Sequence, residues 1–230
     1  MIRAFSRAFG QLPEPELRRV LLLSLTIAFL VFVGLGIATY YLLKYTDFFH
    51  YELFGTDVGA ALIDMLGSLA VLALTWFLFP TVVTLVVGFF LDGTARAVEQ
   101  RHYPELGPAR EQSIGEVLAI TLKFAVVSLV LNLLALPIFL ILLFIPPLNF
   151  FVFYGLNGYL LGREYYELVA HRRFDPPVAR RLRRAFGGQV FVAGVVISIM
   201  MSVPVLNLIA PLVATAAMVH LVNGWRTGSP

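Results

Sequence analysis

Long apolar runs without a single charged residue dominate the chain, and short charged segments separate them. Four such runs have 24, 27, 39 and 35 residues and occupy positions 20–43, 65–91, 124–162 and 185–219. An α-helix rises about 1.5 Å per residue, so about 20 apolar residues cross the ~30 Å hydrocarbon core of a bilayer. The first two runs therefore predict two long transmembrane helices, over residues 17–45 and over residues 58–100, the second with a cytoplasmic extension.

The third and fourth runs are longer, but prolines interrupt them. Pro146 and Pro147 divide the third run, and Pro204 and Pro211 divide the fourth. The second arm of each run has only 15 residues, as in the segment 148–162. As a helix, such an arm spans about 22 Å, which falls short of the hydrocarbon core.

The turns of these two runs carry no charge. They read Ile-Pro-Pro-Leu-Asn and Val-Pro-Val-Leu-Asn and end at Asn149 and Asn207, whereas a loop in water normally carries small polar residues. We therefore favour two re-entrant helical hairpins, over residues 114–171 and 176–225, rather than four complete crossings; their turns need protein or a water-filled cavity around them. The shared turn pattern is either a repeat of hairpins around a membrane site or the turn chemistry of proline and asparagine alone.

Two further segments have the pattern of amphipathic helices at a membrane surface. In residues 1–12, apolar side chains recur at helical spacing while two arginines lie off that stripe. The stripe consists of Ile2, Phe5, Phe9 and Leu12, and the arginines are Arg3 and Arg7. The second hairpin is preceded by a helix in which an apolar stripe, Val178, Leu182 and Phe186, lies among four arginines. We interpret this basic helix as facing phospholipid headgroups.

The composition also indicates a membrane environment. Hydrophobic residues make up 59% of the 230 residues, charged residues make up 13%, and the mean hydropathy is +0.85; a soluble domain has about 45–50% and about 25%. This balance excludes a disordered chain and a typical cytosolic enzyme, and the absence of cysteine excludes a disulfide scaffold. We therefore predict a single membrane domain over residues 1–230, in contact with a phospholipid bilayer.

The basic residues are distributed unevenly along the chain. Of the 17 lysines and arginines, only Lys44 lies in the connection 44–64, and the others lie in residues 1–19, 92–123, 163–184 and the tail. The positive-inside rule then places those segments, and with them the N-terminus, in the cytoplasm. We attribute the net charge of +3 to these segments and expect no nucleic-acid partner.

The sequence contains no recognisable catalytic or metal-binding motif. Its four histidines are scattered, at His50, His102, His171 and His220. There is no cysteine nucleophile, nucleophile elbow, P-loop or zinc-helix signature. We predict no catalytic residue, no bound metal and no cofactor, so we do not expect an enzyme.

Two adjacent arginines open the first long helix and are the best candidate for binding an anion. Leu17, Arg18 and Arg19 follow Pro13 and Pro15. Proline is favoured in the first turn of a helix, where free backbone N–H groups attract anions. Two guanidinium groups at the same place suit a tetrahedral oxyanion. The alternative is that both arginines simply follow the positive-inside rule.

Other polar residues form a candidate pore or gating network. Asp92, Arg96 and Glu99 are spaced to pair along one helical turn at the cytoplasmic end of the second long helix. They either line a pore or form a surface ion pair. Three asparagines in the apolar runs are costly in lipid unless they are paired, so we expect them at hairpin tips or helix contacts. They are Asn149, Asn157 and Asn207.

Small residues predict close contacts between helices. Gly158 and Gly162 form a G-x-x-x-G pattern, and Gly155 lies one turn earlier. Such positions allow two helix backbones to approach each other. The contacts join helices either within one protomer or between the protomers of a homo-oligomer.

The order and spacing of these motifs resemble those of the CysZ sulfate permeases, in the etoposide-induced membrane protein superfamily, over nearly the whole chain. The resemblance rests on Leu-Arg-Arg-Val at 17–20, Phe-Leu-Asp-Gly at 90–93 with Glu99, the two proline-containing turns, and Asn-Gly-Tyr-Leu-Leu-Gly-Arg-Glu-Tyr at 157–165. It implies two long transmembrane helices, two half-penetrating hairpins and an oligomer in the bacterial inner membrane.

The resemblance also implies sulfate uptake, proton-linked or passive, that feeds cysteine synthesis. In the family a Gly-Leu-Arg-Arg stretch binds sulfate, and Arg18 and Arg19 are the matching positions. Glu16 stands where the family has glycine, and a carboxylate beside a dianion is repulsive. We predict transport of sulfate or a related oxyanion into the cytoplasm. The alternative is a non-transporting, membrane-organising or partner-binding protein of the same fold, which would use its amphipathic segments as the working surface.

Overall fold

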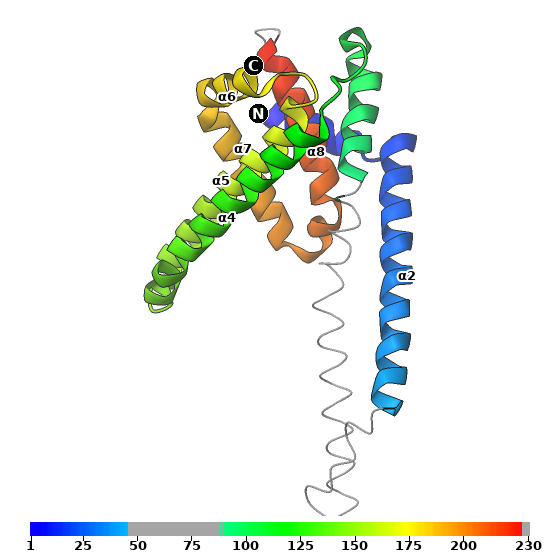
Figure 1. The fold of residues 1–230 in the computed structure, drawn as a ribbon, viewed down its shortest axis with the longest axis vertical. Helices are drawn as coiled ribbons and strands as arrows, with labels where there is room; N and C mark the ends of the chain where they lie inside the picture. The colour runs from blue at the N-terminus through cyan, green and yellow to red at the C-terminus, as the bar shows by residue number, and fades with distance from the viewer. Residues whose placement is uncertain (46–87, 89, 227–230) are drawn as a thin grey trace, which may run out of the picture. The chain divides into compact units, whose positions relative to one another are not determined.

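The computed structural model describes residues 1–45, 88 and 90–226, and these residues form helices with short connections (Figure 1). The described residues contain no β-strand. An all-helical fold with several long apolar helices, compatible with a membrane protein, is therefore confirmed. Most of the predicted transmembrane helix over 58–100 lies outside the described residues. The chain divides into two compact units, one of residues 1–18 and 91–230 and the other of residues 19–90.

Helix α2 (Pro15–Tyr45) is the long helix predicted over residues 17–45. It begins at Pro15, where the missing N–H would have no partner inside the helix in any case. Its segment Pro15–Ile37 is long and apolar enough to cross a membrane. From Arg19 onward the helix belongs to the smaller unit.

The larger unit is a set of helical hairpins. Helices α4 and α5 pack as one antiparallel hairpin and α7 and α8 as another, with turns at residues 143–145 and at Val203 (Figure 1). Its elements are α1 (Ile2–Gly10), a helical segment over 90–102, the 3₁₀ turn η1 (Pro104–Leu106), α4 (Ile114–Leu142), α5 (Pro146–Ala170), α6 (Pro176–Ala185), α7 (Gly187–Ser202) and α8 (Pro204–Arg226).

Local chemistry explains where these helices begin. Proline occupies the first position of α5, α6 and α8, at Pro146, Pro176 and Pro204. The Ser113 Oγ atom accepts a hydrogen bond of 3.2 Å from the Glu116 N–H and caps α4. Pro211, expected to interrupt the fourth apolar run, instead lies inside α8, because the tightly packed surroundings of this helix hold it together despite one missing hydrogen bond.

The hairpin arms are longer than the uncharged runs alone predict. Helix α5 has 25 residues because it continues past Arg163, whose Nε donates a hydrogen bond of 2.8 Å to Glu167 one turn later. Among the described helices, α2, α4 and α8 are each long and apolar enough to cross a membrane, and α6 with α7 would make a fourth span bent by 84°. Helix α7 has only 16 residues, about 24 Å. The half-penetrating layout therefore stays a prediction.

A close helix contact joins α5 to α7. A Cβ atom added to Gly194 would lie 1.9 Å from the Gly158 carbonyl oxygen, and one added to Gly162 would lie 2.3 Å from the Val190 carbonyl oxygen. The two helix backbones therefore touch, and this contact lies within one protomer. An added Cβ at Gly155 would meet nothing within 4 Å, so this glycine is not part of the contact.

Helix α8 is mostly buried within the protein, whereas helix α4 is mostly exposed. In the apolar segment of α8, 78% of the residues are buried, whereas in that of α4 only 6% are buried. Leucine, isoleucine and valine side chains are exposed along α4 from Ile114 to Ile141. An apolar surface of this extent needs lipid or another apolar partner to cover it.

Helix α1 packs on α8 through one face. Ala4, Phe5 and Ala8 are buried there, while Ile2 is 88% exposed. The predicted stripe is therefore divided, because Phe5 belongs to the protein core and Ile2 does not. One face of the amphipathic helix therefore packs on α8 rather than on a membrane surface.

Gly194→Ala tests the α5–α7 contact. Alanine normally stabilises a helix by about 1 kcal/mol relative to glycine, but here its methyl group would push two backbones apart. We expect the free energy of unfolding to fall by about 1–3 kcal/mol, as overpacking typically causes. The control Gly155→Ala has free space and should leave stability unchanged or raised. Denaturant titration in detergent measures both, and equal stability of the two variants would contradict the contact.

Candidate functional site

A cavity of about 640 Å³ opens beside the helical segment 90–102 and the end of α5. Three arginines line it against one carboxylate, so its surroundings are positively charged. The polar lining residues are Arg96, Glu99, Gln100, Tyr103, Arg172 and Arg173. All of them lie in the larger unit. We call this the arginine-lined cavity.

The buried carboxylate of Glu99 organises the wall of this cavity. Its side chain is only 3% exposed. Arg172 donates from Nη2 to Oε2 at 3.1 Å, and Arg173 donates from Nη2 at 2.6 Å and from Nε at 3.1 Å. A buried carboxylate needs such charged donors, because desolvation otherwise costs several kcal/mol. The contact ties the segment 90–102 to the end of α5.

Arg172 links the arginine-lined cavity to an acidic one. Besides Glu99, it donates a hydrogen bond to Asp92. Burial alone would lower the pKa of Arg172, but the hydrogen bond to Glu99 and the charge of Asp92 outweigh it and raise that pKa. Asp92 lines a second cavity of about 430 Å³ together with Glu164, Glu167 and His171. Burial lowers the pKa of His171, so this imidazole favours its neutral form.

Arg173 also shapes the loop that closes the cavity. Its Nη1 atom donates to three successive carbonyl groups at 3.1–3.2 Å, those of Leu106, Gly107 and Pro108. These carbonyls converge because Gly107 has a φ of +66°, a left-handed conformation that glycine adopts without strain. One guanidinium therefore holds both a buried carboxylate and a loop in place.

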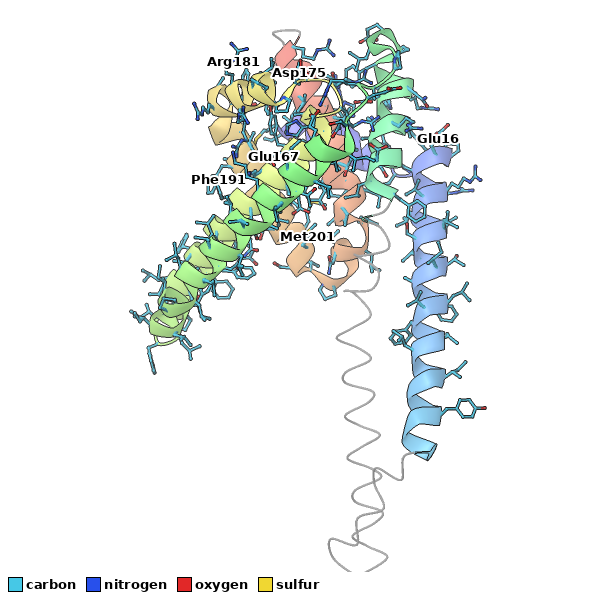
Figure 2. The ribbon with its side chains drawn as sticks, viewed as in Figure 1. Glu16, Glu167, Asp175, Arg181, Phe191 and Met201 are labelled. Carbon is cyan, nitrogen blue, oxygen red and sulfur yellow. The ribbon has the colours of Figure 1, made fainter. Side chains whose placement is uncertain are left out.

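The predicted anion-binding arginines lie at the start of α2. Arg18 and Arg19 are exposed, and neither forms an ion pair with any residue that the structure describes, whereas Leu17 is buried. The Arg18 N–H is already bonded to the Glu14 carbonyl oxygen at 2.9 Å. The carboxylate of Glu16 lies in the same turn (Figure 2). The side chains are thus available to an anion, but fewer backbone donors are free than the sequence indicated.

The structure brings together only part of the predicted polar network. Asp92 and Arg96 form an exposed ion pair of 3.6 Å on the helix that also carries Glu99. Asn149 precedes Arg172 by 23 residues along α5 and its end, about 34 Å, so it belongs to a different region. The Asn157 side chain bonds to its own helix, at the Phe153 carbonyl oxygen.

The remaining predicted asparagine, Asn207, lies in the first turn of α8. Its N–H bonds to the Val203 carbonyl oxygen at 2.8 Å.

Sequence reasoning missed Arg172 and Arg173 as partners of Glu99. The available signal was their position as two adjacent arginines directly after a predicted hairpin arm.

Glu99→Gln tests whether this carboxylate is the counter-charge of the cavity wall. The substitution leaves two buried guanidinium groups with one partner fewer, so we expect the free energy of unfolding to fall by about 3–5 kcal/mol. Asp92→Asn removes a carboxylate that is 55% exposed and should lower it by less than about 1 kcal/mol. Denaturant titration in detergent compares the two, and equal losses would argue against the central position of Glu99.

Comparison with known protein families assigns the chain to one family. The model of the family described as sulfate transporter CysZ/etoposide-induced protein 2.4 matches residues 4–211. A comparison with curated proteins found no match. The matching family is one of membrane transport proteins rather than of enzymes. Because the match covers far more than half of the sequence, the chain belongs to the sulfate transporter CysZ/etoposide-induced protein 2.4 family.

Proposed function

We propose that this protein transports sulfate or a related oxyanion into the cytoplasm and so supplies sulfur assimilation and cysteine synthesis. The observation that carries the proposal is the arginine-lined cavity in a chain of this family. Guanidinium groups match the oxygens of a tetrahedral oxyanion better than ammonium groups do. A volume of about 640 Å³ lies within the usual ~300–1,000 Å³ of small-molecule sites, so a partly hydrated sulfate would fit.

The three arginines of the cavity have different roles in this proposal. Arg172 and Arg173 are engaged with Glu99, and Arg172 also with Asp92, so they form the wall of the cavity rather than direct bonds to substrate. Arg96 is 64% exposed and has only a 3.6 Å contact with Asp92, so it can turn toward an anion. Arg18 and Arg19, exposed at the start of α2, supply recognition.

The surroundings of the protein follow from its exposed apolar surface. We propose a place in the bacterial inner membrane, with the N-terminus in the cytoplasm and the exposed face of α4 against lipid. The tips of the two hairpins end within the bilayer. The protomers assemble into a homo-oligomer, because apolar hairpin tips and their backbone need protein or a polar passage around them.

Cysteine labelling tests the depth of the hairpin tips. The chain has no native cysteine, so Asn149→Cys and Asn207→Cys introduce one label site each. In right-side-out vesicles we expect both to react slowly with a membrane-impermeant maleimide. A cysteine at Asp57, in the acidic connection after the first long helix, serves as the periplasmic control and should react rapidly. Rapid labelling of both hairpin tips from the periplasmic side would refute half-penetrating hairpins.

Flux of radiolabelled sulfate into proteoliposomes tests transport itself. We expect uptake above that of empty vesicles, and a decrease of about tenfold for Arg96→Gln, the effect of losing one charge-assisted hydrogen bond of about 1.5 kcal/mol. Arg18→Ala with Arg19→Ala should also reduce uptake. Arg181→Gln, on the outside of α6 (Figure 2), is the control and should transport normally. Uptake equal to that of empty vesicles, or unaffected by every variant, would remove the proposal.

A membrane-organising function is the second candidate, and α6 favours it. Four arginines lie on this ten-residue helix, and no ion pair within the described part of the chain neutralises them. They are Arg180, Arg181, Arg183 and Arg184. Such a helix binds anionic lipid surfaces. Binding of anionic lipid by a protein that shows no sulfate flux would favour this alternative.

A further inference from the structure

A smaller cavity lies beside α1, away from Glu99 and its arginines. It has a volume of about 210 Å³. Helices α1, α7 and α8 contribute to its wall, together with Tyr103 after the segment 90–102. The side chains that matter here are Arg3, Arg7, Tyr103, Gln189, His220 and Trp225. No carboxylate lines it. We call it the α1 cavity.

Hydrogen bonds among its neutral polar groups hold the wall of the α1 cavity in place. The Trp225 Nε1 atom donates to the Gln189 Oε1 atom at 2.9 Å, and its ring stacks on Phe186 with centroids 4.6 Å apart. The Nδ1 atom of His220 lies 2.8 Å from the Tyr103 hydroxyl, and its Nε2 atom lies 2.8 Å from the Gln11 amide nitrogen. The wall is thus pre-organised, and both ring nitrogens of His220 are engaged.

The charged groups of the cavity are not neutralised by this wall. Arg3 and Arg7 are four residues apart on α1 and lie on one face of the helix, where like charges repel by a few tenths of a kcal/mol. No ion pair connects either of them to a carboxylate in the parts of the chain that the structure describes. Arg7 lines the cavity together with Tyr103, and its charge offsets part of the rise that burial causes in the pKa of Tyr103. An anion between the two arginines would relieve their repulsion.

The size and position of the α1 cavity limit which ligands it can hold. A volume of about 210 Å³ equals roughly seven water molecules at ~30 Å³ each and is below the ~300–1,000 Å³ of drug-sized ligands. It suits one tetrahedral group and excludes a whole nucleotide. At about 100° per residue, Arg3 and Arg7 lie on one flank of α1, while the exposed apolar residues Ile2 and Phe9 lie on the other. The cavity therefore opens on the polar flank of an amphipathic helix.

We propose that the α1 cavity binds a phosphate group between Arg3 and Arg7, either as free inorganic phosphate or as the headgroup phosphate of an anionic phospholipid. Paired guanidinium groups give several donors to one phosphate oxygen face. Tyr103 supplies a further polar contact, and Trp225 forms the apolar side. Both sources present the same chemistry, and they are distinguished by experiment. The site is independent of sulfate transport.

Fluorescence of Trp225 provides the test, because this indole borders the cavity. The chain has two tryptophans, so Trp76→Phe leaves Trp225 as the only one. Inorganic phosphate is titrated in detergent against sodium chloride of equal ionic strength. In a second arm, the protein is placed in phosphatidylcholine nanodiscs with or without 10% phosphatidylglycerol. We expect a saturable change in one arm: a response to inorganic phosphate identifies the free ion, and a response only to phosphatidylglycerol identifies the lipid headgroup.

Substitutions of Arg3 and Arg7 test whether the change in Trp225 fluorescence depends on these two arginines. Arg3→Gln with Arg7→Gln should weaken binding at least tenfold, while Arg3→Lys with Arg7→Lys keeps the charge and should weaken it less. Lys123→Gln removes an exposed positive charge on α4, outside the cavity, and should leave it unchanged. Gel filtration verifies that each variant is folded. No saturable change in either arm, or a change that persists in the glutamine pair, would overturn the proposal.

Discussion

One buried ion cluster holds the polar end of this protein together. Glu99 is surrounded by Arg172 and Arg173, and Arg173 continues to three loop carbonyls. The segment 90–102 and the loop that follows it are thus joined to the end of α5, more than 70 residues further along the chain. Because a buried charge is tolerated only with its partners, the segment 90–102, the loop after it and the end of α5 depend on one another. Both the basic and the acidic cavities take their walls from this cluster.

Helix positions could be predicted from the sequence where apolar run length and proline decide them. Pro146 and Pro204 begin helices because proline is favoured in the first turn, whereas Pro211 lies inside α8. Helix ends were less predictable: α5 passes the charge at Arg163 because Glu167 neutralises it one turn later. The division of the α1 stripe was not predictable either, because it depends on which face α8 covers.

Contacts between distant segments account for most of what the sequence could not indicate about the site. The spacing of Asp92, Arg96 and Glu99 predicted pairing along one helical turn, but Glu99 pairs with arginines 73 and 74 residues further along the chain. The G-x-x-x-G pattern likewise indicated a close approach at Gly158 and Gly162 without naming Gly194 opposite them. Periodicity identifies a face that needs a partner, and only the tertiary fold identifies the partner.

The sharp bend between α6 and α7 has a mechanical consequence. Helix α6 carries four arginines, and α7, which is apolar, leaves it at 84°. If α7 sank deeper into hydrocarbon, it would pull these guanidinium groups out of water at a cost of about 2.5–3.5 kcal/mol each. If α7 moved out of the hydrocarbon, its apolar side chains would be exposed to water, which is also unfavourable. In the membrane placement proposed above, the elbow between α6 and α7 would therefore limit how deeply α7 enters the hydrocarbon.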